Sequence, residues 1–329
     1  MSKKKKKFAI RTDLALEACE LLKAKENPEL DGIITKERKN KTTRITCVNI
    51  VNENGSKIVG KPRGRYITIE DAALRENDIE TKERIIEETT TALKKLLKKF
   101  DTKNVLIAGL GNRYITPDAL GPKVVSGILV TRHIKESLPK KIRDKVSSVS
   151  AISPGVMGIT GIETAEVLSG IVQRSKPDLV IAVDALAARR FSRINAVIQM
   201  TDSGINPGAG VGNKRAKINK KSMGVPVIAI GVPTVVDAAT LVNDTMDRIL
   251  EEMKAASEDK AFYDMLDNIQ TDERYGLIND LLTPYAENMF VTPKEVDSVI
   301  DRLAEIISTA LNSALQPGLD KEDINMFFL

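Results

Sequence analysis

Histidine, cysteine and aromatic residues are scarce in this sequence. Among 329 residues there are one histidine, two cysteines and no tryptophan, and aromatics make up 4%. A Ser-His-Asp or Cys-His arrangement would depend on His133 alone, and no Gly-x-Ser-x-Gly segment is present. Cys19 and Cys47 show no metal-ligand spacing and form no disulfide framework, which excludes a zinc site of several His and Cys ligands. A metal site made of carboxylates alone stays open.

Basic charge is confined to one end of the chain. The net charge of +5 equals the charge of the five lysines between Lys3 and Lys7. A nucleic-acid-binding protein carries a basic face within its fold, and aromatic stacking platforms are also scarce. We therefore expect the lysine run to be a solvated tail and predict no direct nucleic-acid partner.

Long apolar runs are also lacking. No run approaches the roughly 18–20 residues that span a bilayer. The lysines are not followed by the apolar region of a signal peptide. Two cysteines without a framework fit a reducing compartment. The sequence therefore predicts a cytoplasmic protein with no membrane partner.

The first hundred residues predict two helices and an antiparallel hairpin. Residues 14–24 and 79–100 have helical periodicity, and Asp78 is suited to cap the second helix. Asn54-Gly55 separates two alternating apolar runs, which is a strong hairpin signal. We expect a hairpin element over residues 44–69.

After residue 100, strand and helix patterns alternate. This favours an α/β fold with a mainly parallel, twisted central sheet and helices on both faces. A less periodic stretch at about 255–286 is expected to be a helical insertion, and no internal repeat is present. The predicted strands are 104–110, 146–152, 178–184, 194–200 and 225–230, and the predicted helices are 120–136, 162–175, 235–254 and 293–314.

A glycine turn follows the first of these strands, in the stretch NVLIAGLGNRYITPDALGP at residues 104–122. Gly109 and Gly111 suggest a dinucleotide-binding loop, but Tyr114 occupies the position of the third glycine. We therefore predict no nucleotide cofactor. What remains is Asp118, near the start of a helix that it could also simply cap.

Asp184 ends another apolar strand, in DLVIAVDALAAR. In an open parallel sheet, functional groups gather beyond the carboxyl ends of the strands. Asp118 and Asp184 both fall at such ends and can converge. Two close carboxylates can share one proton, so that one acts as base and the other as acid. Each aspartate alone is more commonly a helix cap.

Three glycine-rich segments are predicted at the same edge of the sheet. They are SPGVMGITGIET after the second strand, TDSGINPGAGVGNKR after the fourth and GVPTVVDAATL after the fifth. Glycine lets the backbone approach a ligand closely. We expect a cleft that receives extended backbone or an oxyanion, although each segment alone could be a tight turn. The candidate cleft residues are Gly155, Gly158, Gly161, Gly208 and Gly210.

Taken together, these motifs resemble one known family, the germination proteases of spore-forming bacteria. The matching segments, in order, are FAIRTDLALEA, NVLIAGLGNRYITPDALGPKVV, SPGVMGITGIET, VIAVDALAAR, TDSGINPGAGVGN, GVPTVVDA and FVTPKEVD. They cover nearly the whole chain. The lysine tail and residues 255–285 match least.

The resemblance implies an activity and a site. The family begins the degradation of small acid-soluble spore proteins at germination, inside the spore, and acts as a homotetramer. Its fold is similar to that of hydrogenase-maturation proteases. Its two essential acids would be Asp118 and Asp184, as in an atypical aspartic-type endopeptidase. Hydrogenase-maturation relatives add a histidine and bind a metal, but no histidine occupies a matching loop in this chain. No metal or other cofactor is therefore expected.

The resemblance also implies self-processing. The family is made as a zymogen that removes its own propeptide, and it cuts after an acidic residue and before a large apolar one, in a motif like Thr-Glu-Phe-Ala-Ser-Glu. This chain has TDLALE at residues 12–17. The expected cut lies between Asp13 and Leu14, which separates a 1–13 propeptide from a single 14–329 peptidase domain.

Two alternatives to this function stay open. One is a metal-dependent peptidase of the maturation type that uses the same two aspartates as ligands. The other is a non-catalytic module that binds spore proteins.

Overall fold

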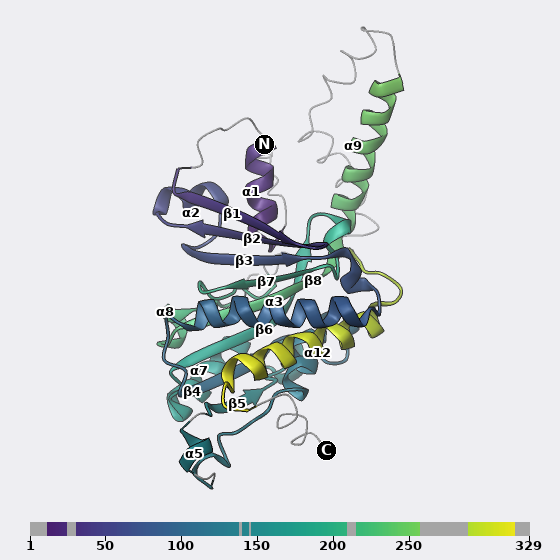
Figure 1. The fold of residues 1–329 in the computed structure, drawn as a ribbon. Coiled ribbons are helices and arrows are strands. Elements are labelled where there is room, and N and C mark those ends of the chain that lie inside the picture. The colour runs from purple at the N-terminus through teal and green to yellow at the C-terminus, as the bar shows by residue number, and fades with distance from the viewer. Residues whose placement is uncertain are drawn as a thin grey trace, which may run out of the picture.

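A computed structural model describes residues 12–24, 31–137, 140–144, 146–208, 215–256 and 289–319. These residues form one nine-stranded sheet in the order β1-β2-β3-β7-β8-β6-β4-β5, with β9 paired to β8 (Figure 1). The strands are β1 Ile33–Asn40, β2 Thr43–Ile50, β3 Gly64–Glu70, β4 Asn104–Gly109, β5 Ser148–Ile152, β6 Leu179–Ala188, β7 Val197–Thr201, β8 Val227–Asp237 and β9 Phe290–Val291.

The sheet is mixed, so the prediction of a mainly parallel sheet holds for only one half of it. β5, β4, β6 and β8 are parallel neighbours. The other strand pairs are antiparallel, and β7 runs between β3 and β8. Only residues 189–196 connect β6 to β7. A parallel return needs a crossover of a dozen residues or more, so β7 must run back in the opposite direction.

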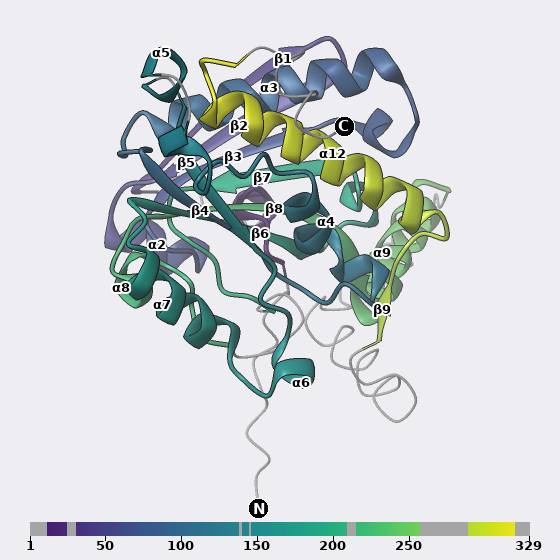
Figure 2. The ribbon, with the colours of Figure 1, turned by 90° about the horizontal axis from the view of Figure 1, so that it is seen from below.

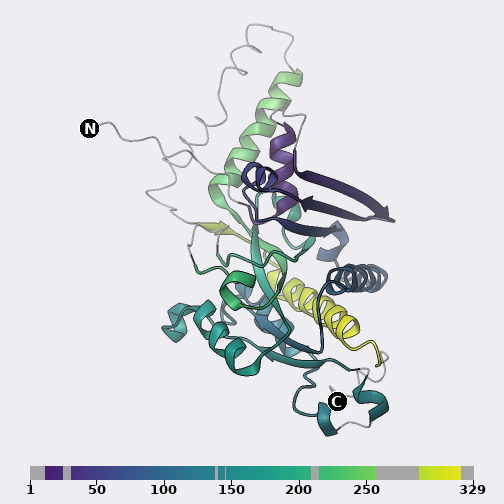
Figure 3. The ribbon, with the colours of Figure 1, turned by 90° about the vertical axis from the view of Figure 1, so that its left-hand side faces the viewer.

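Helices cover both faces of the sheet (Figures 2 and 3). The helices α3, α4 and α12 lie on one face, where the largest apolar cluster is found. The opposite face packs on α7 and α8 in the parallel half and on α1 and α2 in the antiparallel half. The helices are α1 Ala15–Ala24, α2 Glu53–Val59, α3 Ile79–Leu97, α4 Leu120–Ser126, α5 Lys140–Arg143, α6 Met157–Thr160, α7 Thr164–Ser175, α8 Lys220–Met223, α9 Ala238–Ala256 and α12 Val296–Leu315.

The predicted tight hairpin turn at Asn54-Gly55 is wrong. Both residues lie in α2, because Asn52 caps that helix by accepting the Gly55 N–H at 2.8 Å and Gly60 ends it with φ +70°. β2 and β3 still pair antiparallel, as the expected 44–69 element requires. The tight turn of this region instead joins β1 to β2 at Lys41, where φ is +53°.

The predicted helix 120–136 ends early, at Ser126. The Asn312 side chain donates to the Gly127 carbonyl at 2.9 Å and accepts the Leu129 N–H at 3.0 Å. These bonds tie the following segment to α12 in a non-helical path. His133 therefore lies in an exposed turn and not on a helix.

Other predicted elements match within a few residues. The Asp78 cap on α3 is confirmed, since its carboxylate accepts the Thr81 N–H at 2.7 Å. β6 and β8 extend well beyond the predicted ends, to Ala188 and Asp237. α9 ends at Ala256, so nearly all of the predicted 255–286 insertion lies outside the described residues. No helix in the described part of the chain is long and apolar enough to cross a membrane.

Candidate active site

The sequence had suggested that Asp184 ends its strand, but Asp184 lies inside β6. β4 stops at Gly109, which pairs with Val183, so Asp184 is the first residue of β6 that has no β4 neighbour. Its side chain is buried, with 5% of its surface exposed. Its carboxylate accepts the N–H of Ala185 at 3.0 Å. The shorter β4 thus leaves a gap in the sheet at Asp184.

Asp118 fills the neighbouring position from the loop that follows β4. It ends the 3-10 turn Thr116–Asp118 and accepts the Asn112 N–H at 2.8 Å. It does not cap α4, because no side chain caps that helix and Ala119 occupies the N-cap position. Gly111 has φ +106°, and a Cβ there would lie 2.0 Å from the Asp118 carbonyl. The glycine turn therefore serves to place Asp118.

The charge of Asp118 influences the protonation of Asp184. Burial raises the pKa of Asp184 well above its ordinary range, and the charges of Asp118 and Asp13 raise it further. Burial also raises the pKa of Asp118, while the Asn112 N–H and the charge of Arg215 act against that rise. A carboxylate in a desolvated place near another negative charge holds its proton more tightly. The arrangement favours a pair in which Asp184 is protonated first.

The expected cleavage segment lies at this site. The Asp13 N–H donates to the Ala187 carbonyl at 3.0 Å, and the Ala187 N–H donates to the Asp13 carboxylate at 3.0 Å. Ala187 can make these bonds because β4 has already ended and leaves that edge of β6 open. Residue 13 is thus held against the strand that carries Asp184.

Leu14 is completely buried. It packs against Leu186, Val197 and Ile205 on the face of the sheet. Burying such a side chain contributes about 1.5–3 kcal/mol. This apolar site accounts for a large apolar residue after the expected cut.

Two further residues hold this segment, and sequence reasoning missed both. The Lys61 ammonium donates to the Thr12 carbonyl at 2.9 Å. Burial lowers the pKa of Lys61, and the charges of Asp13 and Glu17 act against that effect. Gln199 donates to the Asp13 carbonyl at 3.2 Å and accepts the Ala15 N–H at 2.8 Å. A polar Gln199 in the apolar run NAVIQM was the available signal.

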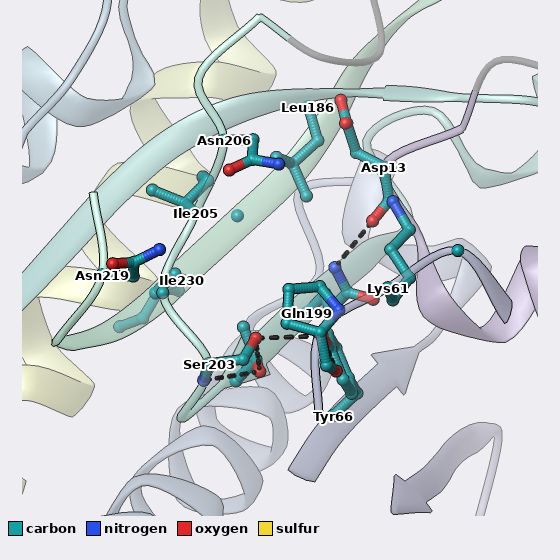
Figure 4. A pocket seen from close by; sticks show the side chains of 16 residues that line it. Asp13, Lys61, Tyr66, Leu186, Gln199, Ser203, Ile205, Asn206, Asn219 and Ile230 are labelled. Carbon is teal, nitrogen blue, oxygen red and sulfur yellow. Dashed lines mark hydrogen bonds between the residues drawn. The ribbon is translucent and has the colours of Figure 1, made fainter. Parts of the chain in front are cut away.

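A cavity of about 150 Å³ adjoins Asp13 and Gln199 (Figure 4). Its walls come from the segment after α2, from β6, β7 and β8, and from the loop after β7. The lining residues include Lys61, Tyr66, Leu186, Ser203, Ile205, Asn206 and Gly231. The expected scissile bond therefore borders an open, partly polar space and is not sealed in the core.

The glycine segments do not form one continuous cleft. The loop with Gly155, Gly158 and Gly161 makes internal side-chain hydrogen bonds through Thr160 and Thr164, and none of its described bonds reaches Asp118 or Asp184. The described hydrogen bonds therefore do not link these three glycines to the two acids.

The loop after β7 starts at the opposite edge of the sheet, because β7 is antiparallel to β8. It returns over the sheet face, where Ile205 packs on Leu14. Gly208 has φ +70° in this loop, and Gly210 lies outside the described residues. The third segment, GVPTVVDAATL, belongs to β8 and the start of α9. The expected single row of loops at one edge is thus wrong.

The side chains available for a metal are few. Within the described ranges, no group of three or more His, Cys, Asp and Glu side chains is arranged to hold a metal ion. Asp118 and Asp184 offer carboxylate oxygens, which suit hard divalent cations.

Comparison with known proteins gives consistent matches over nearly the whole chain. The germination protease model, peptidase family A25, matches residues 12–260 and 250–328. The germination protease of Clostridium tetani is 49% identical over 97% of this chain and 99% of its own length. Those of Caldanaerobacter subterraneus and Bacillus subtilis are 50% and 42% identical, covering 97% and 96% of this chain and 98% and 96% of their own length.

Among solved structures, a [NiFe] hydrogenase maturation protease from Thermococcus kodakarensis overlaps 67% of this chain and 98% of its own. The identity is 18% and the TM-score is 0.33. A likeness of that size supports no conclusion about activity.

Proposed function

This chain belongs to the germination protease family, and we propose that it is the endopeptidase that begins the degradation of small acid-soluble spore proteins when spores germinate. The observation that carries the mechanism is the position of its own residues 12–14. They lie against β6 at Leu186 and Ala187, two and three residues after Asp184, and the charge of Asp13 helps to raise the pKa of Asp184. An aspartic-type hydrolysis needs a peptide bound within reach of two carboxylates that differ in protonation.

The proposed reaction uses water and both aspartates. The ionised carboxylate takes a proton from water as the water oxygen bonds to the carbonyl carbon of Asp13. The carbonyl becomes a tetrahedral oxyanion. The C–N bond to Leu14 then breaks, and the leaving nitrogen takes the proton of the other aspartate. One water is consumed, and a new carboxyl and a new amino end are formed.

We assign the acid to Asp184 and the base to Asp118. Asp184 is the more deeply buried of the two, and its pKa is raised the further. A backbone N–H and the charge of Arg215 act to lower the pKa of both aspartates, but the pKa of Asp184 is also raised by the charges of Asp118 and Asp13, so the ionised form is favoured more at Asp118. The pair therefore carries one proton over a range of pH.

Self-processing follows from the same arrangement. A cut at Asp13–Leu14 releases residues 1–13, which carry the whole charge excess of +5 in the lysine run. Until that cut, Thr12 and Asp13 occupy the place where a substrate would bind. We propose that the chain is a zymogen for this reason. Equal activity of the full chain and of a chain beginning at Leu14, towards a spore-protein substrate, would refute the blocking role.

The substrate preference is supported by the two residues on either side of the cut. Lys61 is near enough to Asp13 for each charge to affect the other, and Leu14 fills a buried apolar site. Small acid-soluble spore proteins with an acid followed by a large apolar residue would fit in the same way.

The decisive test is the removal of each carboxylate. Asp118→Asn and Asp184→Asn keep side-chain size and the hydrogen bonds from Asn112 and Ala185. Leader removal, followed by mass spectrometry at mildly acid pH, should fall by at least about 10³-fold in each variant. The cleavage of a spore-protein substrate should fall equally. Wild-type processing by either variant would refute the carboxylate pair.

The alternatives give different results in the same assay. A metal-dependent peptidase using these aspartates would lose activity in chelator and regain it with a divalent cation. A binding module would keep its leader under all conditions. The proposed mechanism predicts processing that resists chelators.

We also propose assembly into a homotetramer in the spore cytoplasm. α9 supports assembly because it presents exposed apolar side chains at spacings of four, three and four residues. They are Val242, Met246, Ile249 and Met253. That spacing is typical of a helix that packs on another helix. Light scattering after size exclusion should give four times the chain mass, and Met246→Glu should lower it.

A further inference from the structure

Gln199 occupies a special place relative to Asp184. Gly231 on β8 pairs with Asp184 on β6 and with Gln199 on β7. Residues at the same level on neighbouring strands point to the same face of a sheet. Asp184 and Gln199 therefore stand on one face, two strands apart, and the position between them has no side chain. Two strand spacings correspond to about 10 Å.

The segment with the expected cut lies over this face. Leu14 is packed on Leu186 of β6 and on Val197 of β7, the residue two positions before Gln199. The Gln199 side chain is itself buried, with 6% exposed. A buried carboxamide beside an apolar cluster needs partners for both ends, and the chain supplies them from residues 13 and 15.

The orientation of the carboxamide is determined by these partners. The Ala15 N–H can only donate, so Oε1 of Gln199 faces it, at 2.8 Å. Nε2 must then face the Asp13 carbonyl, to which it donates at 3.2 Å (Figure 4). That carbonyl carbon is the atom attacked in the cut between Asp13 and Leu14. The Gln199 side chain thus spans the Asp13–Leu14 peptide bond, with one hydrogen bond to Asp13 before it and one to Ala15 after it.

We propose that Gln199 is a catalytic residue of leader removal, the donor that stabilises the oxyanion formed at the Asp13 carbonyl. This inference rests on the proposed self-processing and adds a residue that the carboxylate pair does not supply. As the carbonyl becomes an oxyanion, the Nε2–H bond to it strengthens. The bond from Ala15 to Oε1 holds the carboxamide in the orientation that donates.

A purely structural role for Gln199 predicts a different response to substitution. A glutamine that only satisfies the Ala15 N–H would be replaceable by any side chain with an acceptor at the same place. Gln199→Glu keeps that acceptor and the size of the side chain, but when ionised it has no proton to donate. Gln199→Met keeps the length and loses both donor and acceptor. The two variants therefore separate donation from packing.

The experiment measures the first-order rate of leader removal in the full chain by mass spectrometry. Both variants should process about 10²–10³-fold more slowly than wild type at neutral pH, the usual cost of losing one oxyanion donor. Gln316→Glu is the matched control, since Gln316 is also buried but bonds to Ser147 near the far end of α12. The control should lower the unfolding temperature and leave the processing rate within about twofold.

The pH dependence of the processing rate distinguishes hydrogen-bond donation by Gln199 from a packing role. The carboxyl group introduced by Gln199→Glu regains an O–H donor when it is protonated, so the rate of this variant relative to wild type should rise as pH falls. The relative rate of Gln199→Met should stay flat. The charged groups of this region that would act on the titration of the introduced carboxyl are Asp184, Asp118, Asp13, Glu17, Lys61 and Arg215.

The outcomes distinguish this inference from the proposed function. If Asp118→Asn and Asp184→Asn block processing while Gln199→Met proceeds at the wild-type rate, the role of Gln199 is wrong and the carboxylate pair stands. If the two aspartate variants process normally, the proposed function fails first. A Gln199→Glu variant that is fully active at neutral pH would also overturn the donor role.

Discussion

The two halves of the sheet contribute different things to the site. The parallel half supplies the acids, since Asp184 lies on β6 and Asp118 on the loop after β4. The antiparallel half supplies the side chains that donate hydrogen bonds to the peptide, Gln199 on β7 and Lys61 just before β3, while β6 adds the backbone of Ala187. Strand β8 joins the halves through Gly231.

This division shows that proton chemistry and peptide binding can be altered separately. The acids depend on backbone turns that are closely packed around Gly111 and Gly121. The binding groups depend on single side chains that line the cavity. Changes in the parallel half should therefore act through the fold and through protonation, and changes in the antiparallel half through docking.

The largest effect is expected for Gly121→Ala in the parallel half. A Cβ at this position would lie 2.3 Å from the Leu110 carbonyl oxygen and 2.6 Å from that of Val183. These backbone oxygens cannot move aside as the end of a flexible side chain can, so α4 and the loop that carries Asp118 must shift. The free energy of unfolding should fall by about 3–5 kcal/mol, and processing should be lost. Denaturant unfolding with parallel mass spectrometry measures both.

The matched control is Gly170→Ala, in α7. Nothing lies within 4 Å of the added carbon there. This change should raise stability by about 0.5–1 kcal/mol through helix propensity. If Gly121→Ala were as stable as Gly170→Ala, the close packing around Gly121 would make no contribution to stability.

A smaller effect is expected for Lys61→Met in the antiparallel half. It removes a charged donor from the Thr12 carbonyl, a bond of about 1.5–3 kcal/mol. Leader removal should slow by roughly ten- to a hundredfold. The unfolding temperature should change little, because removing the buried Lys61 charge relieves a desolvation cost that offsets the lost bond. Lys57→Met on the exposed face of α2 should leave the rate unchanged. A large loss of stability in Lys61→Met, or a normal rate, would contradict a docking role.

The protonation of Asp184 should be visible in stability. Its folded pKa is raised, so the folded state binds the proton more tightly than the unfolded state does. Stability therefore falls as pH rises from the ordinary carboxyl value through the folded pKa. Comparing D118N with D118N/D184N, in chains kept unprocessed, the double variant should unfold about 2–6 °C higher at pH 7. The difference should close towards pH 4; an equal difference at both pH values would contradict the raised pKa.

Dilution of the protein is expected to leave the half-time of leader removal unchanged. Residues 12–14 are held by groups of their own chain, including Ala187, Gln199 and Lys61. Leader removal should therefore be first order, with the same half-time over a hundredfold range of concentration. A half-time that lengthens in proportion to dilution would mean that one chain cuts another, so that the site of each chain acts on the leader of a neighbouring chain.

The sequence predicts the acid half of the site better than the binding half. Asp118 follows one apolar strand and Asp184 lies within another, and the parallel arrangement of these strands can be read from strand–helix alternation. Lys61 has no local signal, and the one local signal of Gln199 is its polarity within an apolar run. The antiparallel direction of β7 follows from a short connection, and α2 replaces a turn that Asn54-Gly55 had indicated.

The missed strand β1 has a similar explanation. All of its residues after Ile33 are exposed, so it shows no apolar alternation. Its partner β2 does alternate, and that alternation predicts the strand. A pattern that arises from burial cannot reveal a strand that buries almost nothing.

The open edge of β6 beyond Gly109 has a consequence for the chain after processing. The N–H and C=O of Ala187 are paired with residue 13 only while the leader is present. Its loss uncovers two hydrogen-bonding groups on a strand edge, the kind of surface that pairs with any extended chain and that proteins usually cover. Residue 13 thus covers part of a strand edge. Its proposed removal would leave an edge that can pair with the backbone of an extended polypeptide.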